Sequence, residues 1–352
     1  MKKLAMIGCG GIGEYHLSHF LQFKDIELAG FCDLIPERAQ AFAEKAGSGR
    51  VFTDYRAMYD EIQPDMVFLC IPPYCHGEIE RETIRRRIPF FVEKPVTLDL
   101  KLAKELRDEI AAAGLITASG FQCRYSKLVA PTNAFIKDHQ ILYINCTRMG
   151  GIPGMPWWRR KDLSGGQIVE QTIHQFDIIR YCFGEPESVF TYTTRGFIRD
   201  VEGYDTDDLS VTAVRFENGT LATVSTGCYV KDGAAYDSKI IFSAADARGE
   251  LSILSKFDVY EPVKQSEDRA ENGFVIQNDG AVQPAQQDGF FRYAEEGDAG
   301  VLCDRTFIDA VLTGDGSKIR SPYADAVKTL EFVMACNQSA ETGLPVRMHF
   351  EQ

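Results

Sequence analysis

The chain has 352 residues, of which 45% are hydrophobic and 25% are charged. This is the composition of a soluble globular protein, and the length suggests two domains, because a domain commonly holds roughly 100 to 200 residues. A disordered chain, a collagen and a membrane bundle are excluded. The formal net charge of −13 would repel nucleic-acid phosphates and anionic lipids, so we expect neither a nucleic-acid nor a membrane partner.

The N-terminus and the cysteines indicate the cellular compartment. The sequence MKKLAMIGCG has only a short apolar run before its first glycine, which is too short for the core of a signal peptide. The ten cysteines are scattered singly, and the closest spacing is Cys70 to Cys75. We therefore expect reduced thiols in a cytoplasmic protein.

Strand-like and helix-like segments alternate over the first third of the chain. The segments expected as strands are 3–8, 26–33, 65–73, 88–95 and 115–120, and those expected as helices are 14–23, 36–47, 75–87 and 99–113. The strand-like runs are continuously apolar, as in strands buried on both faces of a parallel sheet. Because right-handed crossovers place helices on both faces, the pattern predicts a doubly wound α/β domain, which we end at residue 122.

The pattern of expected strands and helices changes in residues 123–352, which we take as a second α/β domain. It is expected to contain helices at 126–138, 165–183, 301–313 and 322–342, a strand at 141–149, a loop at 150–164 and several strands between 186 and 261. The strands alternate apolar and polar residues, and Asn218-Gly219 indicates a hairpin, so we predict an open, mostly antiparallel sheet. The polar segment 262–298 is expected to be a surface loop.

A glycine-rich turn follows the first strand. Gly8, Gly10 and Gly13 fit the pattern GxGxxG and open a helix, so backbone N–H groups can face a pyrophosphate. Asp33 ends the second strand, where its carboxylate can accept hydrogen bonds from ribose hydroxyls and would repel the 2′-phosphate of NADP. We expect NAD, with NADP disfavoured. Arg38 could stack on adenine or reach a phosphate, or it could be a solvated helix residue.

Lys94 ends a predicted strand within the sequence Glu93-Lys94-Pro95. Ligands of such sheets bind at the carboxyl ends of the strands, so its ammonium is a candidate catalytic group, with a solvated lysine as the alternative. Pro95 favours an extended backbone at Lys94 and gives the side chain a defined direction.

Three ionisable residues share one face of the predicted helix 165–183. Glu170, His174 and Asp177 stand at i, i+4 and i+7, within roughly 60° of one another. The other residues of this helix are so apolar that the helix should be largely buried. Burying three charged groups costs free energy, which indicates that they have a function. We favour acid–base chemistry, in which a neighbouring carboxylate raises the pKa of His174 and fixes its tautomer. A three-ligand metal site and a polar stripe facing water or a partner are alternatives, and we expect no metal.

The motifs together resemble those of the glucose–fructose oxidoreductase, inositol dehydrogenase and rhizopine catabolism protein (Gfo/Idh/MocA) family. They occur over nearly the whole chain in the order GCGGIG, Asp33, Pro72-Pro73 with His76 three residues later, EKP, and GGxxxExxxHxxD. The resemblance implies a Rossmann domain followed by an α/β domain with an open, mostly antiparallel sheet, and a last helix, 322–342, that returns to the first domain. It also implies an NAD(P)-dependent reaction at one secondary alcohol of a sugar, inositol or related polyol.

The resemblance also assigns roles to residues. Lys94 and His174 would be catalytic, assisted by Glu170, which stands where many members have aspartate; Gln167 replaces a usual glycine. The residues expected around the substrate are Asp177, Trp157, Trp158, Arg159, Arg124 and Tyr125. Those expected around the cofactor are Gly8, Gly10, Gly11, Ile12, Gly13, Asp33, Arg38, Cys70, Ile71, Pro72, Pro73, His76, Glu93 and Lys94. The tryptophans could instead pack a domain interface.

The sequence therefore predicts an NAD-dependent oxidoreductase for a small sugar or polyol. His174 would remove the hydroxyl proton as hydride leaves for the nicotinamide, while Lys94 stabilises the developing alkoxide. The rival functions are an NAD-retaining lyase or glycosidase that oxidises its sugar transiently, and a non-catalytic NAD-binding regulator. By resemblance we expect a homodimer or homotetramer, since an open sheet needs its exposed face covered.

Overall fold

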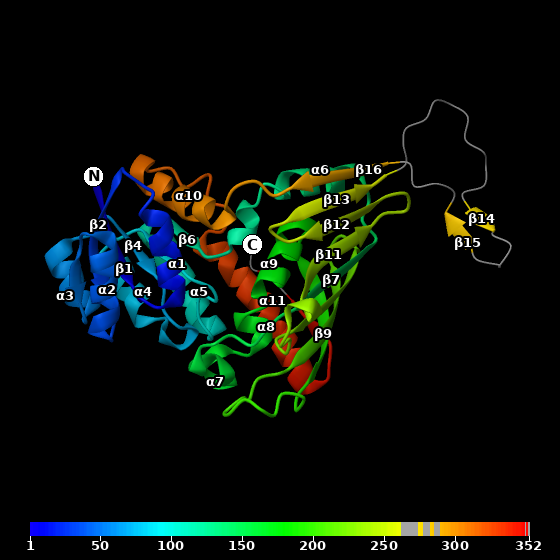
Figure 1. The fold of residues 1–352 in the computed structure, drawn as a ribbon, viewed down its shortest axis with the longest axis horizontal. Coiled ribbons are helices and arrows are strands. Elements are labelled where there is room, and N and C mark those ends of the chain that lie inside the picture. The colour runs from blue at the N-terminus through cyan, green and yellow to red at the C-terminus, as the bar shows by residue number, and fades with distance from the viewer. Residues whose placement is uncertain (262–273, 277–281, 285–288, 349, 351–352) are drawn as a thin grey trace.

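The computed structural model of the chain describes residues 1–261, 274–276, 282–284, 289–348 and 350. Two sheets dominate the structure, one at each end of the molecule as drawn in Figure 1. The helices α8 (Gln167–Glu170) and α11 (Tyr323–Thr342) lie between them, so segments from distant parts of the sequence meet in the middle of the molecule. Among the described residues, no helix combines the length and apolar character that crossing a membrane requires.

The first sheet has the order β3-β2-β1-β4-β5-β6 in the described part of the chain, and all its neighbouring strands are parallel. Its strands are β1 (Lys2–Ile7), β2 (Ile26–Cys32), β3 (Arg50–Phe52), β4 (Met66–Leu69), β5 (Phe90–Val92) and β6 (Thr117–Ser119). Its helices are α1 (Gly11–Phe20), α2 (Pro36–Ala46), α3 (Tyr55–Ile62), α4 (Glu78–Arg85) and α5 (Leu100–Ala113). The predicted doubly wound Rossmann sheet is confirmed. Its strand order reverses between β1 and β4, where such sheets bind ligands.

Strand β3 and helix α3 were not predicted from the sequence. The strand has only three residues, too few to show a period. Helix α3 did carry a signal, because Asp54 caps it by accepting from the N–H of Arg56, and Met58, Tyr59 and Ile62 form its buried face. Several predicted strands are also longer than the observed ones; the strand expected at 65–73, for example, is β4, Met66–Leu69.

The second sheet has the order β16-β13-β12-β11-β7-β10-β9-β8-β17 in the described residues. Its strands are β7 (Tyr143–Met149), β8 (Pro186–Thr194), β9 (Leu209–Phe216), β10 (Leu221–Gly227), β11 (Asp237–Ser243), β12 (Arg248–Ser252), β13 (Lys256–Tyr260), β16 (Phe290–Ala294) and β17 (Val346–Arg347). Pairing is antiparallel except between β7 and β10, so the predicted mostly antiparallel sheet is confirmed. The remaining elements are α6 (Val129–Asp138), α10 (Ala299–Thr313), α11 (Tyr323–Thr342), the short helices η1 (Pro73–Cys75), η2 (Gln122–Tyr125), η3 (Pro156–Arg159) and η4 (Gly233–Ala235), and a separate pair of strands, β14 (Phe274–Ile276) and β15 (Val282–Pro284).

The predicted surface loop 262–298 is wrong at its three described strands. Residues 274–276 and 282–284 are β14 and β15, which pair with each other. Residues 290–294 form β16, which pairs with β13 at the end of the sheet. All five of its side chains are exposed, so no apolar and polar alternation marked it as a strand. Residues 262–273, 277–281 and 285–288 of that prediction lie outside the described residues.

The predicted helix 165–183 is two helices. Helix α8 spans Gln167–Glu170 and helix α9 spans Ile173–Phe183, with Gln171 and Thr172 between them. The Thr172 N–H and hydroxyl both donate to the Gln167 carbonyl oxygen, at 2.8 and 3.0 Å. Because a threonine side chain that bonds a preceding carbonyl distorts a helix, the local chemistry explains the break. The loop expected at 150–164 also contains η3 and the short helix α7 (Lys161–Ser164).

Helix α11 touches both sheets. At its start, the Ser119 N–H donates to the Ser321 carbonyl at 2.8 Å and the Ser321 hydroxyl donates to the Ser119 carbonyl at 2.7 Å. Near its end, the Ser339 hydroxyl oxygen accepts from the N–H of Thr191 on β8 at 3.0 Å. Buried residues of both sheets and of this helix form one hydrophobic cluster, so the two sheets are held in a defined relation around the site.

Candidate active site

A pocket opens at the carboxyl ends of the parallel strands, between the two sheets. The loop before α7 and the helix α8 contribute three of its residues, Met155, Trp157 and Glu170. The other lining residues belong to the first sheet and its loops: Gly8, Gly10, Gly11, Ile12, Asp33, Arg38, Cys70, Ile71, Pro72, Pro73, Glu93 and Lys94. The structure therefore brings most of the predicted cofactor residues to one place.

The glycines of the turn serve two different purposes. A Cβ on Gly8 would lie 2.2 Å from the Cys70 carbonyl oxygen, and one on Gly13 would lie 2.4 Å from the Gly8 carbonyl oxygen. These two positions let the chain pack tightly, and Gly13 does not line the pocket. A Cβ on Gly10 or Gly11 would meet no described atom within 4 Å. These two line the pocket at the start of α1, so a pyrophosphate could approach their backbone N–H groups closely.

The Asp33 carboxylate is held next to the glycine-rich turn by two backbone N–H groups. Its Oδ2 accepts from the Cys9 N–H at 2.8 Å and its Oδ1 from the Ile35 N–H at 2.9 Å. The carboxylate is half-buried, and its remaining lone pairs can accept from ribose hydroxyls. Arg38 lies exposed at the same edge of the pocket. The residues present thus fit the adenosine ribose and pyrophosphate of a dinucleotide.

His76 lies outside the pocket lining, unlike the prolines that precede it. Its side chain is buried, with Nδ1 2.6 Å from Glu80 Oε1. Glu80 also accepts from the Gly77 N–H at 2.6 Å and so fixes the start of α4. In the structure this histidine therefore contacts the first turn of α4 rather than the pocket.

Lys94, Glu170 and Trp158 form a chain of contacts at the inner end of the pocket. Lys94 Nζ donates to the Glu170 carbonyl oxygen at 2.9 Å and to its Oε1 at 3.1 Å. Trp158 Nε1 donates to Glu170 Oε2 at 2.6 Å, and its ring is 1% exposed. Glu170 therefore fixes the lysine ammonium, and the buried tryptophan fixes Glu170. The peptide bond between Lys94 and Pro95 is cis.

His174 is near two cations. Its Nδ1 is buried and has no hydrogen-bond partner among the described residues, and the Phe121 ring meets its ring edge-on with centroids 6.1 Å apart. Burial, followed by the positive charges of Lys94 and Arg148, lowers the pKa of His174 well below its usual value. The expectation that a carboxylate raises this pKa is wrong, because Glu170 binds Lys94 and Trp158 instead. His174 is thus neutral at neutral pH and able to accept a proton.

Asp177, Arg124 and Tyr125 lie in the core rather than along the pocket. Arg124 Nε donates to Asp177 Oδ2 at 2.8 Å, and the Thr329 hydroxyl donates to Asp177 Oδ1 at 2.7 Å. Asp177 is fully buried and Arg124 is 1% exposed. The Tyr125 hydroxyl accepts from the Arg320 N–H at 2.9 Å. These contacts join η2, α9 and α11, and the predicted substrate contacts of all three residues have no support in this geometry.

The residues of the aromatic loop expected around the substrate differ in their position relative to the pocket. Trp157 lines the pocket, and its ring meets Tyr74 edge-on at 6.4 Å, whereas Trp158 lies behind Glu170. Arg159 is half-buried, with its Nε lacking a hydrogen-bond partner among the described residues.

Two residues near the site were not predicted from the sequence. With the Gln171 amide oriented to satisfy its neighbours, its nitrogen donates to Glu170 Oε2 at 3.3 Å and its oxygen accepts from Arg148 Nη2 at 2.9 Å. Arg148 lies on β7. A polar residue is ordinary at a surface position of a half-exposed strand, so this residue type gave no sign of a role in the site. No sequence pattern distinguished it, because only the folded chain brings β7 beside α8.

Comparisons with known proteins agree with this architecture. Residues 2–121 match the GFO_IDH_MocA profile, an oxidoreductase family with an NAD-binding Rossmann fold, and residues 140–248 match the GFO/IDH/MocA C-terminal domain. The D-glucoside 3-dehydrogenase of Escherichia coli (strain K12) is 26% identical over 292 residues, covering 73% of this chain and 82% of that protein. The myo-inositol 2-dehydrogenase of Thermotoga maritima is 26% identical over 244 residues, covering 68% and 71%.

Among solved structures, the chain resembles a myo-inositol 2-dehydrogenase from Lactobacillus plantarum. The TM-score is 0.78 at 22% identity, and the match covers 99% of both chains. At this identity the likeness establishes the fold, including both sheets and their connection.

Proposed function

Because the chain belongs to the Gfo/Idh/MocA family of NAD-binding oxidoreductases, we propose that it is an NAD-dependent dehydrogenase of a sugar, inositol or related polyol. It moves a hydride between a secondary alcohol or ketone and the nicotinamide. The observation that carries the proposal is the position of Lys94, which lines the dinucleotide pocket and binds Glu170 of the second domain at 3.1 Å. The named dehydrogenases among its relatives support the substrate class.

NAD, when bound, supplies the hydride acceptor of the reaction. The backbone N–H groups of Gly10 and Gly11 would hold its pyrophosphate, and Asp33 its adenosine ribose. Asp33 is kept in place by two backbone N–H groups, so a 2′-phosphate would meet a fixed negative charge. This favours NAD over NADP.

His174 acts as the general base. Its low pKa leaves the imidazole neutral, so it can take the hydroxyl proton of the substrate as the C–H bond breaks. The Lys94 ammonium stabilises the developing alkoxide, and Glu170 keeps that ammonium in position. The buried Trp158 indole in turn holds the Glu170 carboxylate, so a chain of contacts orients the reacting groups.

Gln167, which departs from the usual glycine, fixes helix α8. It is fully buried, and its Nε2 donates to the Ser210 hydroxyl at 2.9 Å. Its Oε1 accepts from the Thr226 hydroxyl at 3.1 Å. Because these contacts anchor α8 to β9 and β10, they set the position of Glu170 at the end of the same helix.

The protein acts as a homodimer or homotetramer in the cytoplasm. Aromatic and aliphatic side chains on four strands of the second sheet are exposed, namely Tyr143, Tyr192, Val211 and Leu221. Covering this sheet face with a second copy would bury them, which favours an oligomer. All ten cysteines fall within the described ranges and none forms a disulfide, in keeping with a reducing compartment. Analytical ultracentrifugation tests the oligomer, with a strictly monomeric protein as the contradicting result.

A substrate panel tests the proposed function. Monosaccharides, inositols and their keto derivatives are assayed by NADH absorbance with NAD and NADP in parallel. We expect stoichiometric NADH with at least one polyol, and a strong preference for NAD. Product formation from a glycoside without accumulation of NADH would instead identify the lyase or glycosidase reaction.

A further inference from the structure

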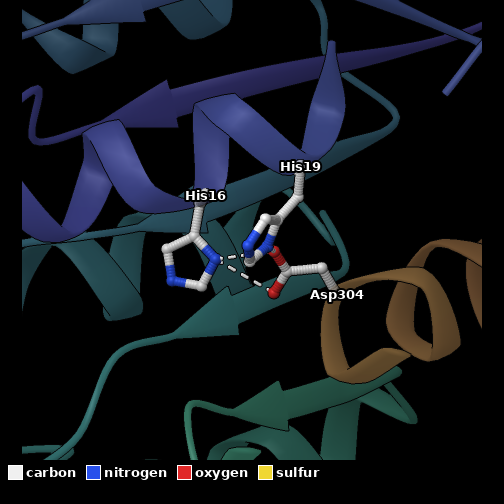
Figure 2. A group of neighbouring side chains, drawn as sticks. All are labelled: His16, His19 and Asp304. Atoms are coloured by element: carbon white, nitrogen blue, oxygen red, sulfur yellow. Dashed lines mark hydrogen bonds and ion pairs between the residues drawn. The ribbon is translucent and has the colours of Figure 1, made fainter. Parts of the chain in front are cut away.

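A buried charge cluster lies between helices α1 and α10, next to the pocket. Figure 2 shows His16 and His19, one turn apart on α1, both facing the carboxylate of Asp304 on α10. His16 Nδ1 is 2.8 Å from Asp304 Oδ2, and His19 Nδ1 is 2.7 Å from the same oxygen. All three side chains are buried, and α10 can approach α1 this closely because Gly300 packs against Tyr15.

The cluster extends to the pocket through the other nitrogen of His16. His16 Nε2 is 2.9 Å from Glu93 Oε1, and Glu93 Oε2 accepts from the Lys94 N–H at 3.1 Å. Glu93 lines the pocket, although it is only 5% exposed. His16 therefore bridges two buried carboxylates, one in the helix α10 and one immediately before the catalytic lysine.

This geometry requires a doubly protonated His16 if both carboxylates are ionised. A carboxylate oxygen only accepts, so each ring nitrogen must donate. The ring otherwise packs against Phe68 and Phe91, at centroid distances of 5.5 and 5.2 Å, where an unpaired charge would be costly. Pairing with two carboxylates offsets that cost. Burial alone would lower the pKa of His16, but the charge and hydrogen bond of Asp304, followed by those of Glu93, raise it to about 10.

Hydrogen bonding explains the cluster better than a bound metal does. Two ligands of one tetrahedral zinc ion, each about 2.0 to 2.2 Å from it, lie roughly 3.3 Å or more apart. The His16 and His19 nitrogens are 2.8 and 2.7 Å from the Asp304 oxygen, which is the spacing of charge-assisted hydrogen bonds.

We propose that His16, donating from both ring nitrogens, is a positioning residue of the cofactor site, which holds the Glu93 carboxylate oriented at the pocket wall beside Lys94. It sits one turn beyond the glycine-rich start of α1, so it connects the pyrophosphate end of the pocket with the end of β5. Asp304 anchors it from α10. The inference depends on NAD binding and not on the identity of the polyol, so a failure of the substrate panel would leave it testable.

The first experiment measures NADH binding by fluorescence titration in three single variants, H16Q, H19Q and E93Q, and in the double variant that combines H16Q with E93Q. H16Q keeps a neutral donor but removes the charge, and we expect a roughly tenfold rise in the Kd, the effect of losing one charge-assisted hydrogen bond. H19Q is the matched control, since His19 contacts the same Asp304 but not Glu93. Its Kd should stay within about twofold of the unchanged protein, because the hydrogen bond from His16 to Glu93 at the pocket wall remains in this variant. H16Q and E93Q together should weaken binding no more than E93Q alone.

The second experiment observes the protonation state directly. In protein labelled with ¹⁵N-histidine, long-range ¹H–¹⁵N spectra from pH 6 to 9 should show both His16 nitrogens protonated, with H16Q assigning the signals. The titratable groups that contact His16 are Asp304 on α10, Glu93, and Tyr15 and His19 on α1. Cys70 and Cys303 lie close to these two carboxylates. A neutral His16 within this range would overturn the proposal.

Three further results would also overturn it: equal losses of NADH affinity in H16Q and H19Q, additive effects of H16Q and E93Q, or a stoichiometric metal that H19Q removes. Circular dichroism and thermal melting establish that each variant is folded. If H16Q does not fold, the NADH affinity of E93Q and the histidine spectra of the unchanged protein test the positioning role instead. An unchanged NADH affinity in E93Q refutes this role, and a higher Kd of E93Q for NADH supports it.

Discussion

Replacing Glu170 with glutamine tests how the lysine ammonium is held. The variant keeps an oxygen that can accept from Lys94 Nζ, and the 2.9 Å bond to the backbone carbonyl of residue 170 is unaffected. What it loses is the charge on the 3.1 Å contact, in a pair whose side chains are only 12% and 11% exposed. A hydrogen bond to a charged group contributes about 1.5 to 3 kcal/mol and a neutral one about 0.5 to 1.5 kcal/mol. The difference of about 1 to 1.5 kcal/mol predicts a roughly 5- to 13-fold fall in kcat/KM.

The assay is steady-state kinetics with the best substrate of the panel, at saturating NAD. If Glu170 orients Lys94 for the transition state, kcat should carry most of the fall and KM should change little. Glu170→Asp is the matched control, because it keeps the charge and shortens the side chain by one methylene. An unchanged kcat/KM in Glu170→Gln would show that the carboxylate does not orient Lys94, as would a loss confined to KM.

Three further predictions follow from the site and its surroundings. In Arg148→Met, loss of a nearby positive charge should raise the pKa of His174. Because only the neutral imidazole can accept the substrate proton, the fall of kcat/KM at acidic pH should then begin at a higher pH than in the unchanged protein. A pH profile that does not shift would contradict this. Gly10→Ala should melt like the unchanged protein yet bind NADH weakly, whereas Gly8→Ala, whose Cβ would lie 2.2 Å from a carbonyl oxygen, should melt at a clearly lower temperature. Asp177→Asn breaks a buried ion pair and should lower the free energy of unfolding in urea by about 3 to 5 kcal/mol, while unchanged stability with a raised KM would restore its predicted role in substrate binding.

The fold was largely predictable because its strongest signals are local. Continuous apolar runs identified every described strand of the parallel sheet except β3, and the Gly-rich turn and Asp33 do line the same pocket. The errors arose where particular hydrogen bonds decide the structure, whether they are local or between distant segments. Thr172 breaks a helix whose apolar pattern is uninterrupted, and β16 is a strand with an entirely exposed set of side chains. Propensity and periodicity carry no information on either.

The sequence indicated several residues of the candidate site, but it did not predict most of the contacts that these residues make with one another. Lys94 and Glu170 do meet, and spacing along the chain alone could not show that the Trp158 indole completes the contact. Helical spacing placed Asp177 beside His174, but Asp177 pairs with Arg124 in the core instead. Which partner satisfies a buried carboxylate depends on elements far away in sequence, and these come together only on folding.

The central claim is direct hydride transfer at a site built on Lys94 and His174. The measurement that tests it most directly uses the best polyol of the panel, deuterated at its carbinol carbon, with NAD. We expect NADH to accumulate with the deuterium at C4 of the nicotinamide, and this transfer to be lost in both Lys94→Ala and His174→Ala. Deuterium released to water, or transfer that persists in both variants at the original rate, would contradict it.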